Sequence, residues 1–381
     1  LARLDKHGLS VVTAVLVMAF AARLFDLSGQ GLTVDEVFWI HRGPYFIANG
    51  TTPWTATASL NLPTATLVGL SIASLPGLDA IVAGRLPVAI IGALTCVSVL
   101  FFVSRQYSPV VGAVAAALLA VDPIHVGLSR ISGVDAPLTF FMTLSLLSLY
   151  ESERTRSLSY TCIAAFSFAL ALLTKPNALT IPLTAIAYLA TVPLFNKSTA
   201  PSHVSRLTLL VRSLRQNLRY VVAWLTIAAL TVYLAWPEMW RKPKDAIATY
   251  LLSSLGNSSS PFPNFFMGVA TTNPPFYYYL VIVPIRLPEI ACAGAVIGLA
   301  VLAYRAYHRC PSKFEWFLVC WAVPFLVMMS SVPKKLGARY ALPVWPVLYV
   351  FVAIGLVWIV QTLAHFNGRL GRSRATGRAR H

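Results

Sequence analysis

The sequence predicts an all-α polytopic membrane protein with about ten transmembrane helices. Its 381 residues are 57% hydrophobic and 11% charged, whereas soluble domains carry roughly 25% charged residues. Apolar runs recur along the chain, and a bilayer crossing needs roughly 17–25 such residues. No polar stretch is long enough to build its own core. We therefore expect one membrane domain over 1–361, followed by a basic, disordered cytoplasmic tail over 362–381.

Ten apolar runs are long enough to cross, or nearly cross, a bilayer. They lie at about 9–27, 86–104, 109–121, 134–150, 159–174, 176–193, 219–236, 276–303, 316–332 and 341–361. The first follows a basic start, as a cleaved signal peptide does, but no small-residue cleavage site stands out and we favour a span. We expect the eighth to be kinked or broken at its prolines. The short, proline-bounded stretch 62–76 suits an interfacial or re-entrant helix.

The distribution of charge sets the predicted orientation. Ten spans place both termini on one side, together with the segments 105–108, 151–158, 194–219 and 304–315. That side carries 18 of the 30 basic residues and four of the 13 acidic ones. Since basic residues concentrate in cytoplasmic loops, we expect both termini in the cytoplasm of a multi-pass protein, most simply in a prokaryotic plasma membrane. The two long outer loops, 28–85 and 237–275, then lie on the non-cytoplasmic face.

Ionisable and aromatic residues gather at the predicted outer boundary of the membrane, where charges are costly unless they pair or serve function. The candidates are Asp35, Glu36, Arg85, Arg130, Asp135, Lys175, Tyr278, Lys335, Arg339 and Tyr340. Carboxylates and cations meet here at the depth of a lipid phosphate. The pattern predicts a site for a substrate that has an anionic headgroup and an isoprenoid tail.

Several short motifs occur in a characteristic order. They are Asp35-Glu36 after the first span, Arg85-Leu86-Pro87, Ser129-Arg130 with Asp135-Ala136-Pro137-Leu138, Leu173-Thr174-Lys175-Pro176, the Pro-Pro-Phe-Tyr-Tyr run at 274–278, and the run 335–343. This order resembles the GT-C membrane glycosyltransferases, in particular the bacterial branch related to protein O-mannosyltransferases and lipid A aminoarabinose transferases. The resemblance covers roughly 9–361. It implies transfer of a sugar from a polyprenyl-phosphate-linked donor to an acceptor on the non-cytoplasmic face.

By that resemblance Asp35 is the catalytic carboxylate and Glu36 its partner in shaping the site. Asp135 matches a second loop aspartate of the cavity, while Arg85 and Arg339 hold the donor phosphate. The chain departs from the family at Asn61-Leu62-Pro63, where relatives often carry a charged residue or His. That departure weakens any metal ligand or donor contact carried over to this position.

The chemistry of the transfer needs a base and fixed positive charge. Polyprenyl phosphate leaves readily, so the acceptor hydroxyl needs a base and the departing phosphate needs cations. Asp35 supplies the base in this hypothesis, although Glu36 stays an alternative. Plain structural interpretations also stay open: Asp35 as a helix cap, Asp135 as an ordinary helix start, and Lys175 as a snorkelling turn residue.

Two other classes of function remain as alternatives, a polytopic transporter and a non-catalytic lipid-binding subunit. Transporters usually show internal repeats and charges at the bilayer midplane, and neither is evident here. No phosphate-cradling glycine loop or nucleic-acid-binding pattern accompanies the net charge of +17. We assign no cofactor and no metal ligands, and a divalent metal stays an open alternative. The expected partners are the lipid-linked donor, membrane lipids, and a protein, lipid or glycan acceptor.

Overall fold

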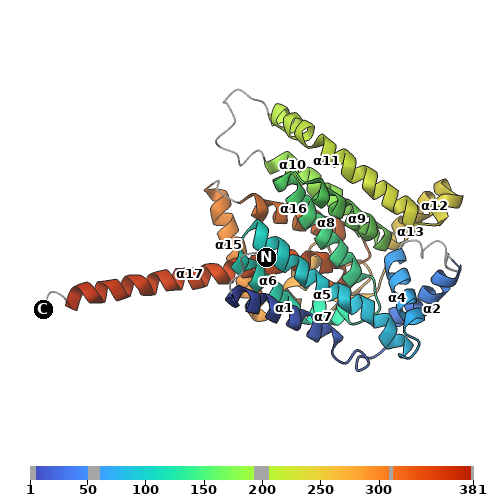
Figure 1. Cartoon of the computed structure of the whole chain (residues 1–381), viewed down its shortest axis with the longest axis horizontal. Helices are drawn as coiled ribbons and strands as arrows, with labels where there is room; N and C mark the ends of the chain where they lie inside the picture. Colours follow the sequence, from blue (N-terminus) through green and yellow to red (C-terminus); the bar gives the residue numbers. More distant parts are fainter. Residues whose placement is uncertain (1–5, 50–60, 193–205, 309–311, 379–381) are drawn as a thin grey trace.

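A computed structural model describes residues 6–49, 61–192, 206–308 and 312–378 and consists almost entirely of helices (Figure 1). The first half contains α1 (Lys6–Leu24), α2 (Val34–Asn49), α4 (Leu62–Ser74), α5 (Ala80–Gln106), α6 (Pro109–Ala120), α7 (Pro123–Ser129), α8 (Asp135–Thr155), α9 (Leu158–Thr174), η2 (Pro176–Leu179) and α10 (Thr180–Thr191). The second half contains α11 (Arg206–Ala235), α12 (Glu238–Arg241), α13 (Pro243–Ser259), α14 (Tyr278–Arg286), α15 (Glu289–Tyr307), α16 (Lys313–Ser331), η4 (Gly337–Val344) and α17 (Trp345–Arg378). Strands β1 (Asn264–Phe266) and β2 (Val269–Thr271) pair antiparallel in a short hairpin.

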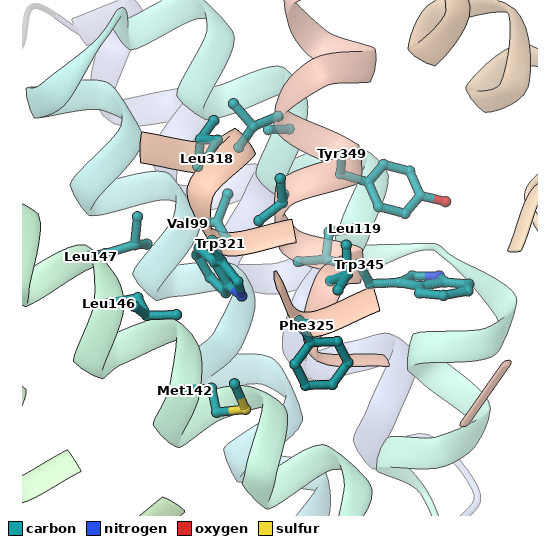
Figure 2. Close-up of a cluster of buried hydrophobic side chains, with 14 of the residues drawn as sticks. Val99, Leu119, Met142, Leu146, Leu147, Leu318, Trp321, Phe325, Trp345 and Tyr349 are labelled. Carbon is teal, nitrogen blue, oxygen red and sulfur yellow. The ribbon is translucent and has the colours of Figure 1, made fainter. Parts of the chain in front are cut away.

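The centre of the bundle is a continuous apolar core. Figure 2 shows side chains of α5, α6, α8, α16 and α17 meeting there, among them the fully buried Met142, Trp321 and Trp345. Burying an aromatic or aliphatic side chain contributes roughly 1.5–3 kcal/mol in water. In a membrane this packing instead supplies dispersion contacts, which hold the helices together where lipid is equally apolar.

Five helices of the described residues are long and apolar enough to cross a membrane, and a sixth span is added if α6 and α7 count as one bent element. The five segments are Ala80–Gln106, Asn217–Ala235, Glu289–Tyr307, Lys313–Ser331 and Gly337–Ala364. Shorter apolar helices occur at Gly8–Leu24, Leu62–Ser74 and Leu158–Thr174. The chain is therefore an integral membrane protein, while the total of about ten spans stays a prediction.

Proline places two interruptions in the predicted spans. The run 276–303 is broken between Arg286 and Glu289, as expected, because Pro288 cannot continue the hydrogen-bond ladder of α14. The run 109–121 ends at Val121, after which α7 turns away from α6 by 62°. Asp122 follows the end of α6 and begins α7, because its carboxylate accepts the backbone N–H of His125 at 2.6 Å.

The structure also differs from the sequence prediction at the C-terminal tail. Residues 362–378, expected to be disordered, continue α17 as a helix that projects from the bundle (Figure 1). Continuing an established helix carries no nucleation cost, which is the largest barrier for an isolated segment of this length. Residues 50–60 of the predicted first outer loop, 193–205 of a predicted inner loop and the last residues of the tail, 379–381, lie outside the described residues.

Helices α2 and α4 lie in the segment predicted to be the first outer loop, and two glycines set how closely they cross. A Cβ placed on Gly69 would lie 2.3 Å from the carbonyl oxygen of Gly43. A Cβ on Gly43 would lie 2.6 Å from the backbone nitrogen of Gly69. Because backbone atoms oppose each other on both sides, neither position accepts a methyl group without separating the helices.

We predict that Gly69→Ala lowers the stability of the purified protein. The added methyl group forces α2 away from α4, and overpacking of this kind typically costs about 1–3 kcal/mol. Gly77→Ala is the matched control, since nothing lies within 4 Å of a Cβ at Gly77. Thermal unfolding in detergent measures both variants. Equal melting temperatures for the two would contradict the close crossing of α2 and α4.

Candidate active site

The acidic pair at the start of α2 divides between two environments. Both residues lie in the first turn, where the helix dipole favours carboxylates. The side chain of Glu36 is fully buried, whereas the side chain of Asp35 is 47% exposed. Successive residues of a helix point about 100° apart, so burying one member of the pair leaves the other facing outward. Asp35 is therefore the carboxylate of the pair that a substrate can reach.

Glu36 forms a buried ion pair with Arg85 of α5. Arg85 donates to both carboxylate oxygens, at 2.7 and 2.9 Å, and also to the carbonyl oxygens of Leu27, Gln30 and Gly31. Glu36 also accepts the backbone N–H groups of Thr33 and Ser132 at 2.9 and 3.0 Å. This network ties the segment between α1 and α2 to α5 and to the loop before α8.

The network sets the charge state of Glu36. Burial raises the pKa of its carboxyl group, but hydrogen bonds from Arg85 and the two backbone N–H groups outweigh burial and hold the pKa below its ordinary value. Arg85 is fully buried and its guanidinium nitrogens all donate within this network. Arg85 was expected to contact the donor phosphate, but its guanidinium group has no open face for that contact. A role in positioning Asp35 fits the contacts of Arg85 better.

Arg339 joins the exposed Asp35 to a second carboxylate, Asp135. Its Nε donates to Asp135 Oδ2 and its Nη2 donates to Asp35 Oδ2, both at 2.8 Å. Lys175 Nζ donates to the other oxygen of Asp135 at 2.5 Å. The side chain of Asp135 is only 5% exposed, while that of Arg339 is 32% exposed. Four residues distant in sequence therefore form one ion network at the surface.

Local backbone features place each member of the network. Asp135 lies in the first turn of α8. Lys175 ends α9 with an extended backbone, the conformation that a following proline favours. Arg339 lies in η4 just after Gly337, whose φ of +57° turns the chain at little steric cost. The ring of Tyr340 lies 4.5 Å from Lys175 Nζ, in a cation–π contact.

Two further cations add positive charge to this site. Burial lowers the pKa of Lys334, and the positive charges of Lys175 and Arg339 lower it further, which places Lys334 within their electrostatic reach. Burial also lowers the pKa of Arg42, while the charge of Asp35 opposes that shift. Arg42 was not among the residues predicted from the sequence, although its position seven residues after Asp35 puts both on one face of α2.

The other predicted site residues do not join the ion network. Arg130 donates to the carbonyl oxygens of Phe25 and Asp26. Lys335 is buried and donates to the carbonyl oxygens of Val332 and Pro274. Tyr278 donates to Asn264 Oδ1 and accepts the N–H of Gly337. These contacts anchor the chain around the site, and the role of the three residues in substrate binding stays a prediction.

The described residues contain no group of three or more His, Cys, Asp or Glu side chains that would suit a metal ion. Asp35 and Asp135, which lie near each other as expected, instead share the guanidinium group of Arg339. His125, the lone imidazole of this region, lies 2.7 Å from Arg23 through its Nδ1. The geometry therefore assigns these carboxylates to an ion network with Arg339.

Comparison with known proteins identifies the fold. Residues 68–215 match a family model described as dolichyl-phosphate-mannose-protein mannosyltransferase. No curated protein sequence matches the chain. Among solved structures, ArnT from Cupriavidus metallidurans bound to undecaprenyl phosphate is similar, with a TM-score of 0.67 and 17% identity over 91% of this chain and 59% of ArnT.

Two further solved structures share the architecture. The oligosaccharyltransferase AglB from Archaeoglobus fulgidus, in complex with an inhibitory peptide and a dolichol-phosphate, has a TM-score of 0.59 and 15% identity over 96% of this chain and 52% of AglB. The arabinosyltransferase EmbB from Mycobacterium smegmatis has a TM-score of 0.52 and 14% identity over 93% of this chain and 31% of EmbB. This chain thus spans about three fifths or less of each protein. It has the same fold as these membrane glycosyltransferases, which is the fold that the resemblance of its motifs predicts.

Proposed function

We propose that the protein transfers a sugar from a polyprenyl-phosphate-linked donor to an acceptor hydroxyl on the non-cytoplasmic face of the membrane. The observation that carries the proposal is the exposed Asp35, bound to Arg339 beside Asp135 and Lys175. The GT-C fold supports the same reaction class, and the similar structures that contain undecaprenyl phosphate or dolichol-phosphate support the class of donor. The acceptor is a hydroxyl of a protein, lipid or glycan.

The reaction needs one proton acceptor, and Asp35 is the residue we assign to it. The acceptor oxygen attacks the anomeric carbon of the sugar and its proton passes to Asp35. The bond between that carbon and the phosphate oxygen breaks, and the polyprenyl phosphate leaves with the electron pair. Glu36 is the weaker candidate, because its carboxylate is fully buried and both its oxygens accept hydrogen bonds from Arg85.

The cations of the site are suited to the departing phosphate. Arg339 keeps an exposed face and offers a planar fork of donors that matches phosphate geometry. Lys175 is held beside it by Asp135, and Lys334 and Arg42 add charge within electrostatic reach. Arg339 and Lys175 balance the two carboxylates that they bind, and Lys334 and Arg42 make the surroundings positive, so the site favours an anionic headgroup. Such preorganised charge is the usual means of stabilising a leaving phosphate.

We assign Glu36 and Arg85 a positioning role. Arg85 binds three carbonyl oxygens of the segment between α1 and α2, and Glu36 binds Arg85. The pair thereby fixes the first turn of α2, from which Asp35 projects toward Arg339. In this proposal neither side chain touches the substrate.

Asp35→Asn is expected to lower the rate of sugar transfer by about 10²–10⁴-fold, the usual contribution of a general base. The amide retains the size of the side chain but does not accept the proton. Transfer from a polyprenyl-phosphate sugar by the purified protein measures the effect. Asp79→Asn is the matched control, because Asp79 caps α5 away from the ion network and asparagine caps equally well. Near wild-type transfer by Asp35→Asn would remove Asp35 from the mechanism.

Arg339→Lys is expected to raise the KM for the donor by at least about tenfold. Lysine keeps the charge but loses the planar fork that binds a phosphate through two hydrogen bonds. Steady-state kinetics with varied donor and varied acceptor separate the two affinities. Arg286→Lys, an exposed arginine at the end of α14, serves as the control. A change confined to the acceptor KM would show that Arg339 does not bind the donor phosphate.

Removing one member of the Glu36–Arg85 pair should destabilise the protein strongly. Glu36→Gln leaves a buried guanidinium without its carboxylate, and the loss of one partner typically costs about 3–5 kcal/mol. The double variant Glu36→Gln/Arg85→Met removes both charges and is expected to recover part of that loss. Thermal unfolding measures the series. Single and double variants that match the wild type would contradict the structural role of the pair.

The pair also predicts a dependence of stability on pH. Since the folded pKa of Glu36 lies below its ordinary value, the stabilisation is complete above the ordinary pKa and is lost as pH falls through the folded value. Unfolding scans from pH 7 downward should therefore show a loss in the wild type that is smaller in Glu36→Gln. Identical pH profiles would show that Glu36 is not held ionised by folding.

A further inference from the structure

A cavity of about 250 Å³ lies among α8, α10, α11 and α16, and it is distinct from the ion network. Its wall is largely apolar and includes Leu149, Ile186, Leu189, Val221, Leu225 and Phe317. Asp135 begins α8, whereas Glu153 near the end of α8 lines the cavity. Those 18 residues rise by about 27 Å along a helix, close to the roughly 30 Å of a bilayer's hydrocarbon core. Along α8, which contains the predicted span 134–150, the cavity is therefore separated from Asp135 by about the thickness of a bilayer core.

Two buried hydrogen-bond donors line this otherwise apolar space. Tyr188 and Trp224 are 3% and 6% exposed, and neither the hydroxyl of Tyr188 nor the indole N–H of Trp224 has a hydrogen-bond partner within the described parts of the chain. Leaving such a group unsatisfied costs about 1–3 kcal/mol. Packing holds both rings in place: Tyr188 contacts Phe317 edge-on, and Trp224 stacks on Phe168 at 4.6 Å. An occupant with an acceptor oxygen would satisfy them.

Two exposed arginines lie beside residues that line the cavity: Arg156 donates to the side-chain oxygen of Asn217, and Arg219 donates to the hydroxyl of Tyr220. We call this end of the cavity its mouth. The guanidinium groups of Arg156 and Arg219 lie 5.9 and 4.6 Å from the ring of Tyr220, which lines the cavity. Glu153 lies 3.7 Å from Arg156, so one carboxylate faces two cations. The Tyr220 hydroxyl donates to the carbonyl oxygen of Arg156 and fixes the end of α8 against α11. The mouth thus carries net positive charge, which attracts anionic headgroups.

The spacing of these groups matches a glycerophospholipid. Tyr220 and Trp224 are four residues apart on α11, so they lie on the same face and are separated by about 6 Å along the helix axis. In a glycerophospholipid the ester carbonyls likewise lie just below the phosphate, at the top of the acyl chains. A polyprenyl phosphate offers no carbonyl at this depth, and a zwitterionic lipid adds a cation at the mouth.

We propose that this cavity binds one anionic glycerophospholipid of the leaflet opposite Asp35. One acyl chain occupies the space between α10 and α11, the ester carbonyls accept from Tyr188 and Trp224, and the phosphate binds Arg156 and Arg219. The bound lipid joins α10 and α11, whose connecting segment lies outside the described residues. The inference stands apart from the proposed transfer reaction, because binding is measured without any sugar donor.

Native mass spectrometry of the delipidated, purified protein tests the proposal, with palmitoyl-oleoyl phosphatidylglycerol as the probe. We expect it to bind at least about tenfold more tightly than the matching phosphatidylcholine. Arg156→Gln/Arg219→Gln should remove that preference, and Tyr188→Phe should weaken binding severalfold. Arg154→Gln, an exposed arginine paired with Glu151, is the control and should bind as the wild type does. Equal affinity of the wild type for both lipids would overturn the proposal.

Filling the cavity provides the second arm of the test. Ala185→Trp and Ile186→Trp place an indole in the cavity and should abolish binding of phosphatidylglycerol. Leu183→Trp is the matched control, since Leu183 is exposed on the same helix and does not line the cavity. Undecaprenyl phosphate should not displace the bound phosphatidylglycerol. Displacement, or unchanged binding in both filled variants, would show that the cavity is not a phospholipid site.

Discussion

The buried ion pair between Glu36 and Arg85 is the constraint on which the site depends. Arg85 is fixed in α5 and binds the carbonyl oxygens that lead into α2, so it determines where α2 begins and which way its first turn faces. With Glu36 turned inward, the neighbouring Asp35 must face outward. The same two carboxylates, adjacent in sequence, thereby acquire different chemistry: one is a buried structural group bound to Arg85 and the other is open to solvent.

Arg339 links the outward-facing Asp35 to the rest of the site. It draws together α2, α8 and η4 through two hydrogen bonds, and Lys175 adds the end of α9. Each carboxylate of this network lies at a helix start and each cation in a turn or cap, where the backbone is already bent toward the surface. The positive charge that Lys334 and Arg42 add near this network suits a lipid phosphate, and the exposure of Asp35 suits an acceptor hydroxyl. These two properties support the proposed transfer reaction.

The sequence predicted the all-helical membrane class and the cluster around Asp35, because apolar runs and ionisable residues at their ends are visible without contacts. It did not separate Arg85 or Lys335 from Arg339. All three are cations at span ends, and only the partner atoms show that the first two are buried among carbonyl oxygens or against Glu36. The break at Pro288 could be predicted from the proline itself. The 62° bend after α6 was not, because an Asp-Pro step marks a helix boundary without giving the new direction.

The most direct test is a cryo-electron microscopy structure of the protein with polyprenyl phosphate, the product of the proposed reaction. We expect density for the phosphate within hydrogen-bond reach of Arg339 and Lys175, with the carboxylate of Asp35 beside it and open to solvent, and with Glu36 still bound to Arg85. A phosphate bound elsewhere, with the network of Asp35, Arg339 and Asp135 left intact and unoccupied, would contradict it.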